Sequence, residues 1–233
     1  MYAIGEIILV VIGILIALAI NNANQKRLEK ANEQAYLIGL KEEFQASKNK
    51  LTELIKVNKQ SYEGAKTIMQ YISNDSIVPS EKEFSGLLYR TFAFDIAFNP
   101  NNSLLNEMIN SGGLKGISNP KLRIHLTNWV STLEDIAKQE NDLGAQRERV
   151  LDILRTNEHS IKTILDNTMV SAQLSLQGTN NGVSNLELLN SMEFENNILI
   201  FILTSYATEK THYEPLMKNM DRILEMIASE IKD

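Results

Sequence analysis

One stretch near the start of the chain constrains its fold more than any other feature. Residues 3–20 read AIGEIILVVIGILIALAI, which is 18 residues with a single charge, Glu6. A helix of this length rises about 27 Å, close to the ~30 Å hydrocarbon core of a bilayer. The asparagines that follow return the chain to water. We therefore predict a transmembrane helix over residues 1–22.

A cleaved signal peptide is the alternative for this stretch, because Ala17-Leu18-Ala19 has the form of a cleavage site. No basic residue precedes the apolar stretch, and signal peptides begin with a basic segment. We expect the helix to be retained as an anchor in the lipid bilayer.

One face of the predicted membrane helix carries small and polar residues. Gly13 and Ala17 form a small-xxx-small pair, which lets two helix backbones approach closely in lipid. Asn21 continues the same face at helical spacing. We predict that Gly13, Ala17 and Asn21 form a helix-association face, directed to a second copy of the chain or to another membrane protein. The alternative is that small residues are common in membrane helices and have no such role.

Glu6 lies on the same face, about one turn inside the apolar stretch. An acidic side chain that faces lipid is costly. Either the carboxylate reaches headgroup water and has no role, or it faces a protein interface or an aqueous lumen. In the second case Glu6 is a candidate ion or proton site.

The remaining chain has the periodicity of packed helices. Apolar residues from Leu37 to Ile72 follow a 3-4 alternation, and no proline occurs before Pro79. A second seam runs from Leu122 to Ile164 with the same period. We predict an all-α fold in which the transmembrane helix continues into an elongated helical bundle with coiled-coil-like seams. Residues 23–78 form a long helix extending from the membrane, and residues 79–233 form a helical bundle domain packing on 23–78.

Local signals refine this prediction. Ser80 and Glu83 have the spacing of a capping box, and Pro215 should break or kink the last helical region after His212. Residues 198–203 are six apolar residues in a row, too few to span lipid, so we expect them to be buried on all sides. Residues 168–185 are polar and predicted to form a loop.

Two charged residues, Glu140 and Arg147, lie in the second seam. A charge at such a position must be paired or solvated. The seam either ends in water there or contains a buried polar layer that sets the helix register.

The sequence offers little for catalysis. It has no cysteine, which excludes disulfides, thiolate zinc sites and cysteine nucleophiles. The pair Glu209 and His212 has the spacing of a di-iron ligand motif, but no second such pair occurs. The net charge of −6 disfavours binding to nucleic acid. We predict no catalytic residue, no metal, no cofactor and no nucleic-acid partner.

Two stretches resemble a known group of proteins. Residues 2–22, YAIGEIILVVIGILIALAINN, closely resemble the opening of uncharacterised single-pass membrane proteins of Bacteroidetes-type bacteria. Residues 98–129, FNPNNSLLNEMINSGGLKGISNPKLRIHLTNW, resemble the central block of the same family. The resemblance implies a membrane-anchored helical protein of unknown activity and assigns no catalytic residues.

The orientation in the membrane follows from the same resemblance. Lys26, Arg27 and Lys30 after the apolar stretch would by themselves keep the large domain in the cytoplasm. Members of the resembled family carry a basic segment before YAIGE, which this chain lacks at Met1-Tyr2 and which would place the domain in the periplasm. We follow the family and expect a bacterial inner-membrane protein with most of the chain in the periplasm.

Two functions fit these features. The first is a membrane-anchored, homo-oligomeric helical scaffold, adaptor or sensor ectodomain without catalytic activity. The alternative is an ion- or proton-conducting, or ion-powered, membrane assembly that uses Glu6.

Overall fold

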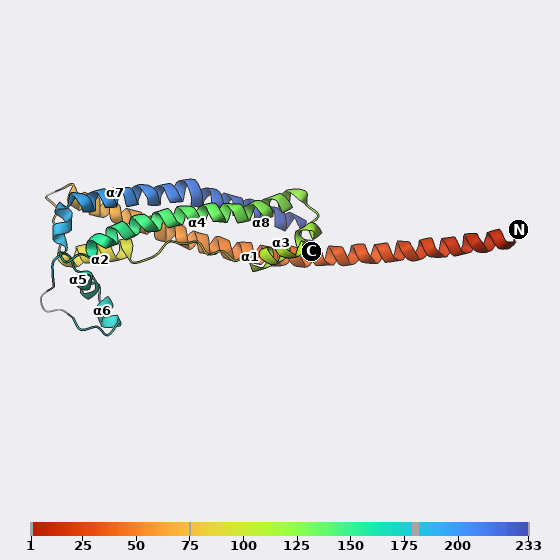
Figure 1. Ribbon diagram of the computed structural model, residues 1–233, viewed down its shortest axis with the longest axis horizontal. Helices are drawn as coiled ribbons and strands as arrows, with labels where there is room; N and C mark the ends of the chain where they lie inside the picture. Colours follow the sequence, from red (N-terminus) through yellow and green to blue (C-terminus); the bar gives the residue numbers. More distant parts are fainter. Residues whose placement is uncertain (1, 75, 179–181, 233) are drawn as a thin grey trace. The chain divides into compact units, whose positions relative to one another are not determined.

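The computed structural model describes residues 2–74, 76–178 and 182–232, with side chains from residue 9 onward. Every regular element in these residues is helical, and they contain no strand (Figure 1). The predicted all-α fold is confirmed. The chain divides into two compact units, which are described one at a time.

Helix α1 (Tyr2–Ile72) contributes to both units. No proline interrupts it, and its described part from Leu9 contains a stretch long and apolar enough to cross a membrane, with a mean hydropathy of 1.4. None of that stretch is buried against other described residues. The helix ends at Ile72, where a turn through Asn74 and Ser76 follows.

Unit 1 comprises Met1–Ala46, Asn101–Trp129 and Asp221–Asp233. In it α3 (Ser103–Ser111), η1 (Gly113–Gly116), the first part of α4 (Pro120–Leu154) and the last part of α8 (Glu214–Glu230) pack with α1. Its core consists of buried apolar side chains from α1, α3, α4 and α8 and from Ile117, which follows η1: Leu37, Leu40, Phe44, Leu105, Met108, Ile117, Leu122, Leu126, Trp129, Ile223 and Ile227.

Trp129 is the largest buried side chain of unit 1. Its ring centroid lies 5.0 Å from that of Phe44, with a tilted geometry. Its indole N–H donates to Asn102 Oδ1 at 3.1 Å, so the buried donor is satisfied. The tryptophan therefore joins α1, α4 and the start of α3.

Acidic side chains of α1 hold the ends of the neighbouring elements. The Glu43 carboxylate accepts the N–H groups of Leu104 and Leu105, at 2.6 and 3.2 Å, in the first turn of α3. These N–H groups have no partner within their own helix, and the positive end of the helix dipole favours the carboxylate. Glu33 likewise accepts the N–H of Ser118 at 2.6 Å.

Unit 2 comprises Ser47–Pro100 and Val130–Met220. It contains α2 (Glu81–Phe92), α5 (Ile161–Asn167), α6 (Val170–Gln173), η2 (Leu186–Asn190), α7 (Met192–Ala207) and η3 (Thr208–Tyr213), together with parts of α1, α4 and α8. Aromatic pairs join α2 to α7: Phe84 with Phe194 at 6.4 Å and Phe92 with Phe201 at 5.1 Å between ring centroids.

The predicted capping box at the start of α2 is confirmed. Ser80 Oγ accepts the N–H of Glu83 at 3.2 Å, and Glu83 Oε2 accepts the N–H of Ser80 at 2.8 Å. These hydrogen bonds lower the pKa of Glu83. The local sequence signal was sufficient here because both partners lie within four residues.

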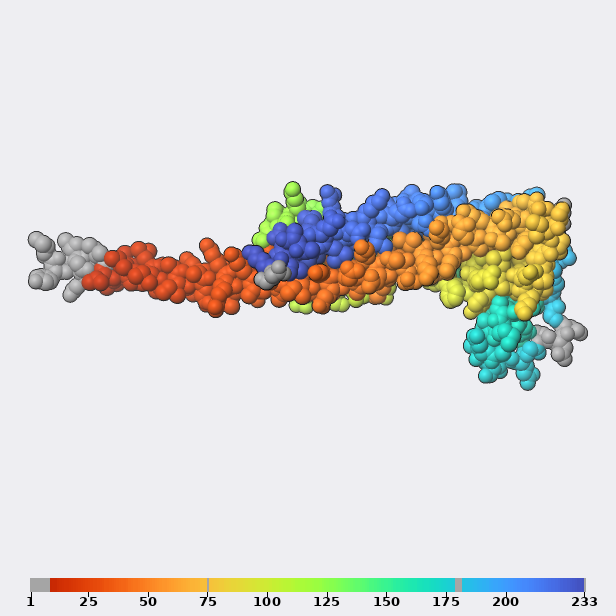
Figure 2. Space-filling model, turned by 180° about the vertical axis from the view of Figure 1, so that it is seen from behind, coloured from red at the N-terminus to blue at the C-terminus, as the bar shows by residue number. Residues whose placement is uncertain are grey.

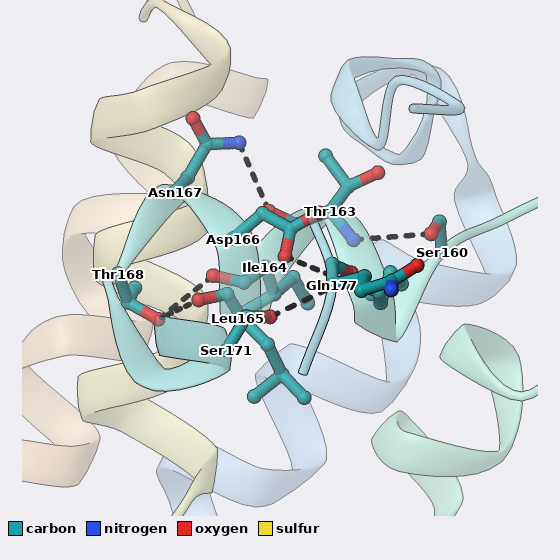
Figure 3. A network of polar contacts seen from close by, with 10 residues as sticks. Ser160, Thr163, Ile164, Leu165, Asp166, Asn167, Thr168, Ser171 and Gln177 are labelled. Carbon is teal, nitrogen blue, oxygen red and sulfur yellow. Dashed lines mark hydrogen bonds and ion pairs between the residues drawn. The ribbon is translucent and has the colours of Figure 1, made fainter. Parts of the chain in front are cut away.

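The second seam is shorter than predicted. Helix α4 ends at Leu154, and the positions expected to continue it, up to Ile164, belong partly to a turn and partly to α5. Ser160 caps α5 by accepting the N–H of Thr163 (Figure 3). The side chain of Asn185 accepts the Ser160 N–H and donates to the Ser160 carbonyl, at 2.8 and 2.9 Å. Asn185, which is 25 residues away in sequence, thus fixes the turn between α4 and α5.

The prediction that residues 198–203 are buried on all sides is wrong. Of residues 198–203 only Ile198 and Phe201 are buried, whereas Leu203 is 68% exposed, so α7 lies at the surface of the unit. No break follows His212. Instead α7 passes through the π-helical turn η3 into α8, whose second residue is Pro215. The wider hydrogen-bonding pattern of a π-helical turn accommodates a proline, which has no N–H to donate.

The predicted loop over residues 168–185 contains the short helix α6. It begins after Met169, which adopts φ 64°.

Two helical glycines of unit 2 provide a matched test of this packing. A Cβ at Gly64 would clash with Oγ1 of the buried Thr91, whose β-branched side chain has few alternative rotamers in a helix. We expect Gly64→Ala to lower the free energy of unfolding by about 1–2 kcal/mol, measured by denaturant melts followed by circular dichroism.

Gly144 is the control because a Cβ there meets nothing within 4 Å among the described residues. Gly144→Ala should raise the free energy of unfolding by up to about 1 kcal/mol through helix propensity alone. Equal effects of the two substitutions would contradict the close packing of Gly64 on α1 against Thr91 on α2.

Candidate functional site

The predicted association residues lie in a part of α1 that is exposed on every side, from residue 9 to residue 32. Gly13, Ala17 and Asn21 are exposed, and a Cβ placed on Gly13 would meet no described atom within 4 Å. The Glu6 side chain, the predicted ion or proton site, lies outside the described residues.

This face continues beyond the apolar stretch. From Ala17 the positions 21, 24, 28, 31, 35 and 38 follow in strict alternation of four and three residues. Two of them carry large apolar side chains in water, since Leu28 is 54% and Ile38 is 49% exposed. We call residues 13, 17, 21, 24, 28, 31, 35 and 38 the outer seam. Positions 28, 31, 35 and 38 were not predicted as part of this face, although their spacing alone indicates them.

The opposite face of α1 is covered. Leu37, Leu40 and Leu51 are fully buried, and the seam predicted from Leu37 onward is the inner face of the helix. From residue 33 onward α1 therefore has one face that packs within the chain, whereas residues 9–32, with most of the outer seam, pack on no described residue on any side.

Unit 2 contains a partly buried carboxylate at one of the two charged seam positions. Glu140 Oε1 accepts the Tyr213 hydroxyl at 2.7 Å and the N–H of Phe98 at 2.8 Å. Burial raises the pKa of Glu140, and the two hydrogen bonds only partly oppose this. Burial, together with the Glu140 charge, also raises the pKa of Tyr213. Glu140 therefore joins α4, the segment after α2, and η3 in a polar layer.

Arg147, the other charged seam residue, is also paired. Its Nε donates to the Phe92 carbonyl at 2.8 Å, and its Nη1 lies 2.8 Å from Oε1 of Glu148. Both charges support the buried-layer alternative over a solvated seam end.

A second polar cluster surrounds the π-helical turn. Glu209 is only 4% exposed, and its Oε1 lies 3.1 Å from Lys210 Nζ. The Tyr62 hydroxyl hydrogen-bonds to Glu209, and burial together with this bond raises the pKa of Tyr62 to about 12. One turn away, Asn58 Nδ2 donates to the Ser205 carbonyl at 3.0 Å.

Three buried oxygens of this cluster have no hydrogen-bond partner among the described residues: Asn58 Oδ1, Ser205 Oγ and Glu209 Oε2. Buried polar groups are nearly always paired, and π-helical turns often occur at functional positions. Two pairs of residues at i, i+4 spacing create the cluster: Asn58 with Tyr62 on α1, and Ser205 on α7 with Glu209 on η3. The one sequence signal for the cluster is Asn58, a polar residue at a position of the first seam.

The cluster does not have the arrangement of a metal or nucleophile site. In the part of the chain that the structure describes, no three histidine, aspartate or glutamate side chains converge to hold a metal ion. Its chemistry is that of hydrogen bonding and charge burial between helices.

A third network is local to α5 and α6 (Figure 3). Asn167 Nδ2 donates to the Thr163 carbonyl and Thr168 Oγ1 to the Ile164 carbonyl, at 2.9 and 2.8 Å. Lys162 Nζ lies 2.8 Å from Asp166 Oδ1. These contacts stabilise α5, which is too short to be stable alone.

Comparison with known proteins places the chain in a family. Residues 6–137 match a family of unknown function, DUF6090. The chain belongs to DUF6090. The expected resemblance to an uncharacterised family is confirmed to that extent. No curated protein and no solved structure gave a significant match.

The DUF6090 match spans most of α1, all of α2 and α3, and the first half of α4. Several residues within the matched range have structural roles. Gly112 ends α3 with φ 74°, Asn119 Oδ1 caps α4 by accepting the N–H of Leu122, and Trp129 fills the core of unit 1. Residues 98–129, which resemble the central block of the family, thus contribute a helix end, a helix cap and a core side chain to the fold.

The raised pKa of Glu140 gives a test of the polar layer. A carboxyl group whose pKa is higher in the folded than in the unfolded protein stabilises the fold most below the unfolded pKa, and this stability is lost as pH rises through the folded pKa. We expect the stabilising contribution of Glu140 to fall as pH rises, so that the unfolding free energy of the wild type falls relative to that of Glu140→Gln as pH is raised above 4.5.

The matched control is Glu134→Gln, which changes an exposed carboxylate on the same helix. It should leave the pH profile of the melting temperature unchanged. If Glu140→Gln and Glu134→Gln gave the same profile, the Glu140 layer would contribute no pH-dependent stability.

Proposed function

We propose that this protein is a membrane-anchored, homo-oligomeric helical scaffold, adaptor or sensor ectodomain without catalytic activity. Its anchor is the apolar part of α1 in a bacterial inner membrane, with most of the chain in the periplasm. The observation that carries the proposal is the outer seam, an uncovered helix face that runs from the apolar stretch into the polar part of α1.

A second copy of the chain fits this face for a geometric reason. Copies inserted by the same signal lie parallel in one bilayer, so their outer seams meet in register. Gly13 and Ala17 allow close approach within the lipid. Asn21 and Asn24 follow at seam positions, where a polar residue selects register and the number of strands.

The polar part of the seam adds apolar contact. Burial of a leucine or isoleucine side chain contributes about 1.5–3 kcal/mol when it is complete. Leu28 and Ile38 lie half exposed on the seam and gain part of this in a parallel helix pair. The buried polar groups of unit 2 hold helices together, which agrees with a role in packing and assembly.

The test is the oligomeric state of the full chain in a mild detergent. Gly13→Leu places a bulky side chain where two backbones approach, so we expect the dissociation constant to rise at least about tenfold, which corresponds to ~1.4 kcal/mol. The measurement is the mass of the protein–detergent complex by light scattering across a dilution series.

Ala19→Leu is the control because residue 19 lies on the other side of the helix and the change adds comparable bulk. It should leave the mass unchanged. A wild-type chain that is monomeric in the detergent at all concentrations would contradict the proposal. Loss of ion flux in Glu6→Gln, with assembly intact, would replace the scaffold with an ion-conducting assembly.

A further inference from the structure

A hollow of about 640 Å³ lies in unit 1 just beyond the apolar stretch of α1. Its walls come from three segments: α1 over residues 26–34, the chain around η1 over residues 115–118, and the chain end at Glu230 and Lys232. Figure 2 shows the end of α8 lying against α1 at this level, with the segment that precedes α4 beside it.

Hydrogen bonds fix these walls to one another. Gln34 donates to the Glu230 carbonyl at 3.0 Å and accepts the N–H of Lys232 at 2.8 Å. Asn119 Nδ2 donates to the Glu230 carboxylate at 2.7 Å, and Glu33 accepts the Ser118 N–H. The hollow is therefore a built feature of the unit, and all three of its carboxylates already accept hydrogen bonds, Glu29 from Gln25 at 3.1 Å.

Lysines dominate the charge of this hollow. Lys26, Lys30, Lys115 and Lys232 all line it, and none forms an ion pair with a residue that the structure describes. Four ammonium groups face three carboxylates there, in a chain whose net charge is −6. The hollow is thus locally positive and suited to an anion.

The distance from the apolar stretch identifies the kind of anion. Lys26 follows Ile20 by six residues, about 9 Å along a helix at 1.5 Å per residue. Headgroup layers extend roughly 5–8 Å beyond each side of the hydrocarbon core, and a lysine side chain adds several ångströms of reach. Lysines close to an anionic membrane surface contribute about 1 kcal/mol each to binding.

We propose that the hollow binds the headgroup phosphate of an anionic phospholipid in the adjacent leaflet. The proposal rests on the proposed anchoring of α1 in a bilayer. It is compatible with the proposed oligomer because Lys26 and Lys30 lie across α1 from the outer seam at Gly13 and Ala17. Self-association through the seam therefore leaves the hollow open to lipid.

The experiment compares the full chain reconstituted in vesicles of phosphatidylcholine alone and of phosphatidylcholine with phosphatidylglycerol, followed by detergent extraction and native mass spectrometry. We expect the wild type to retain phosphatidylglycerol in preference to phosphatidylcholine. The quadruple variant Lys26→Gln, Lys30→Gln, Lys115→Gln and Lys232→Gln should lower this retention at least about tenfold, as expected for the loss of four such contacts.

The matched control carries the same charge change away from the hollow, in Lys41→Gln, Lys59→Gln, Lys138→Gln and Lys218→Gln, and should retain phosphatidylglycerol like the wild type. Equal loss in both quadruple variants, or no preference between the two lipids, would overturn the proposal. Competition by inorganic phosphate as strong as by lipid would assign the hollow to free phosphate instead.

Co-flotation of the protein with vesicles separates this proposal from the anchoring on which it rests. A chain that floats with both vesicle types but shows no lipid preference is anchored and has no headgroup site. A chain that floats with neither is not anchored, and both proposals fail.

Discussion

The structure depends on one uninterrupted helix with two different faces. The inner face of α1 carries side chains that are fully buried, among them Leu37, Leu40 and Leu51, and it supplies core residues to both units. The outer seam begins in a stretch apolar enough to cross a membrane and continues past it. Because a helix keeps its faces aligned along its length, a contact made by the seam in lipid also orients the seam outside it.

Polar groups determine how the helices of unit 2 fit together. Apolar side chains alone allow neighbouring helices to slide by a turn at modest cost, whereas a buried carboxylate such as Glu140 tolerates only the positions that satisfy it. The polar cluster around Glu209 restricts the helix positions in the same way. Three of its buried oxygens have no hydrogen-bond partner among the described residues. An incompletely satisfied cluster is also where a helix pair can change its packing most easily, which is the property that a sensor domain requires.

Local signals predicted much of this fold. The all-α class, the capping box at Ser80 and the cap at Asn119 follow from residues that lie close together in sequence. The early end of α4 could not be predicted from nearby residues, because Asn185 fixes Ser160 from 25 residues away. The polar cluster could not be predicted from local signals either, because its partners Asn58 and Ser205 are 147 residues apart. The exposed face of α7 was missed because a short apolar run does not reveal which side it buries.

The central claim is that copies of α1 meet through the outer seam. The chain has no cysteine, so single substitutions allow disulfide cross-linking to be scanned along the helix in vesicles. We predict that oxidation cross-links Gly13→Cys, Ala17→Cys and Asn24→Cys efficiently, and Leu15→Cys and Leu18→Cys poorly, with the 3.5-residue period of a helix pair. Uniform cross-linking at all five positions, or a maximum at residues 15 and 18, would contradict the account.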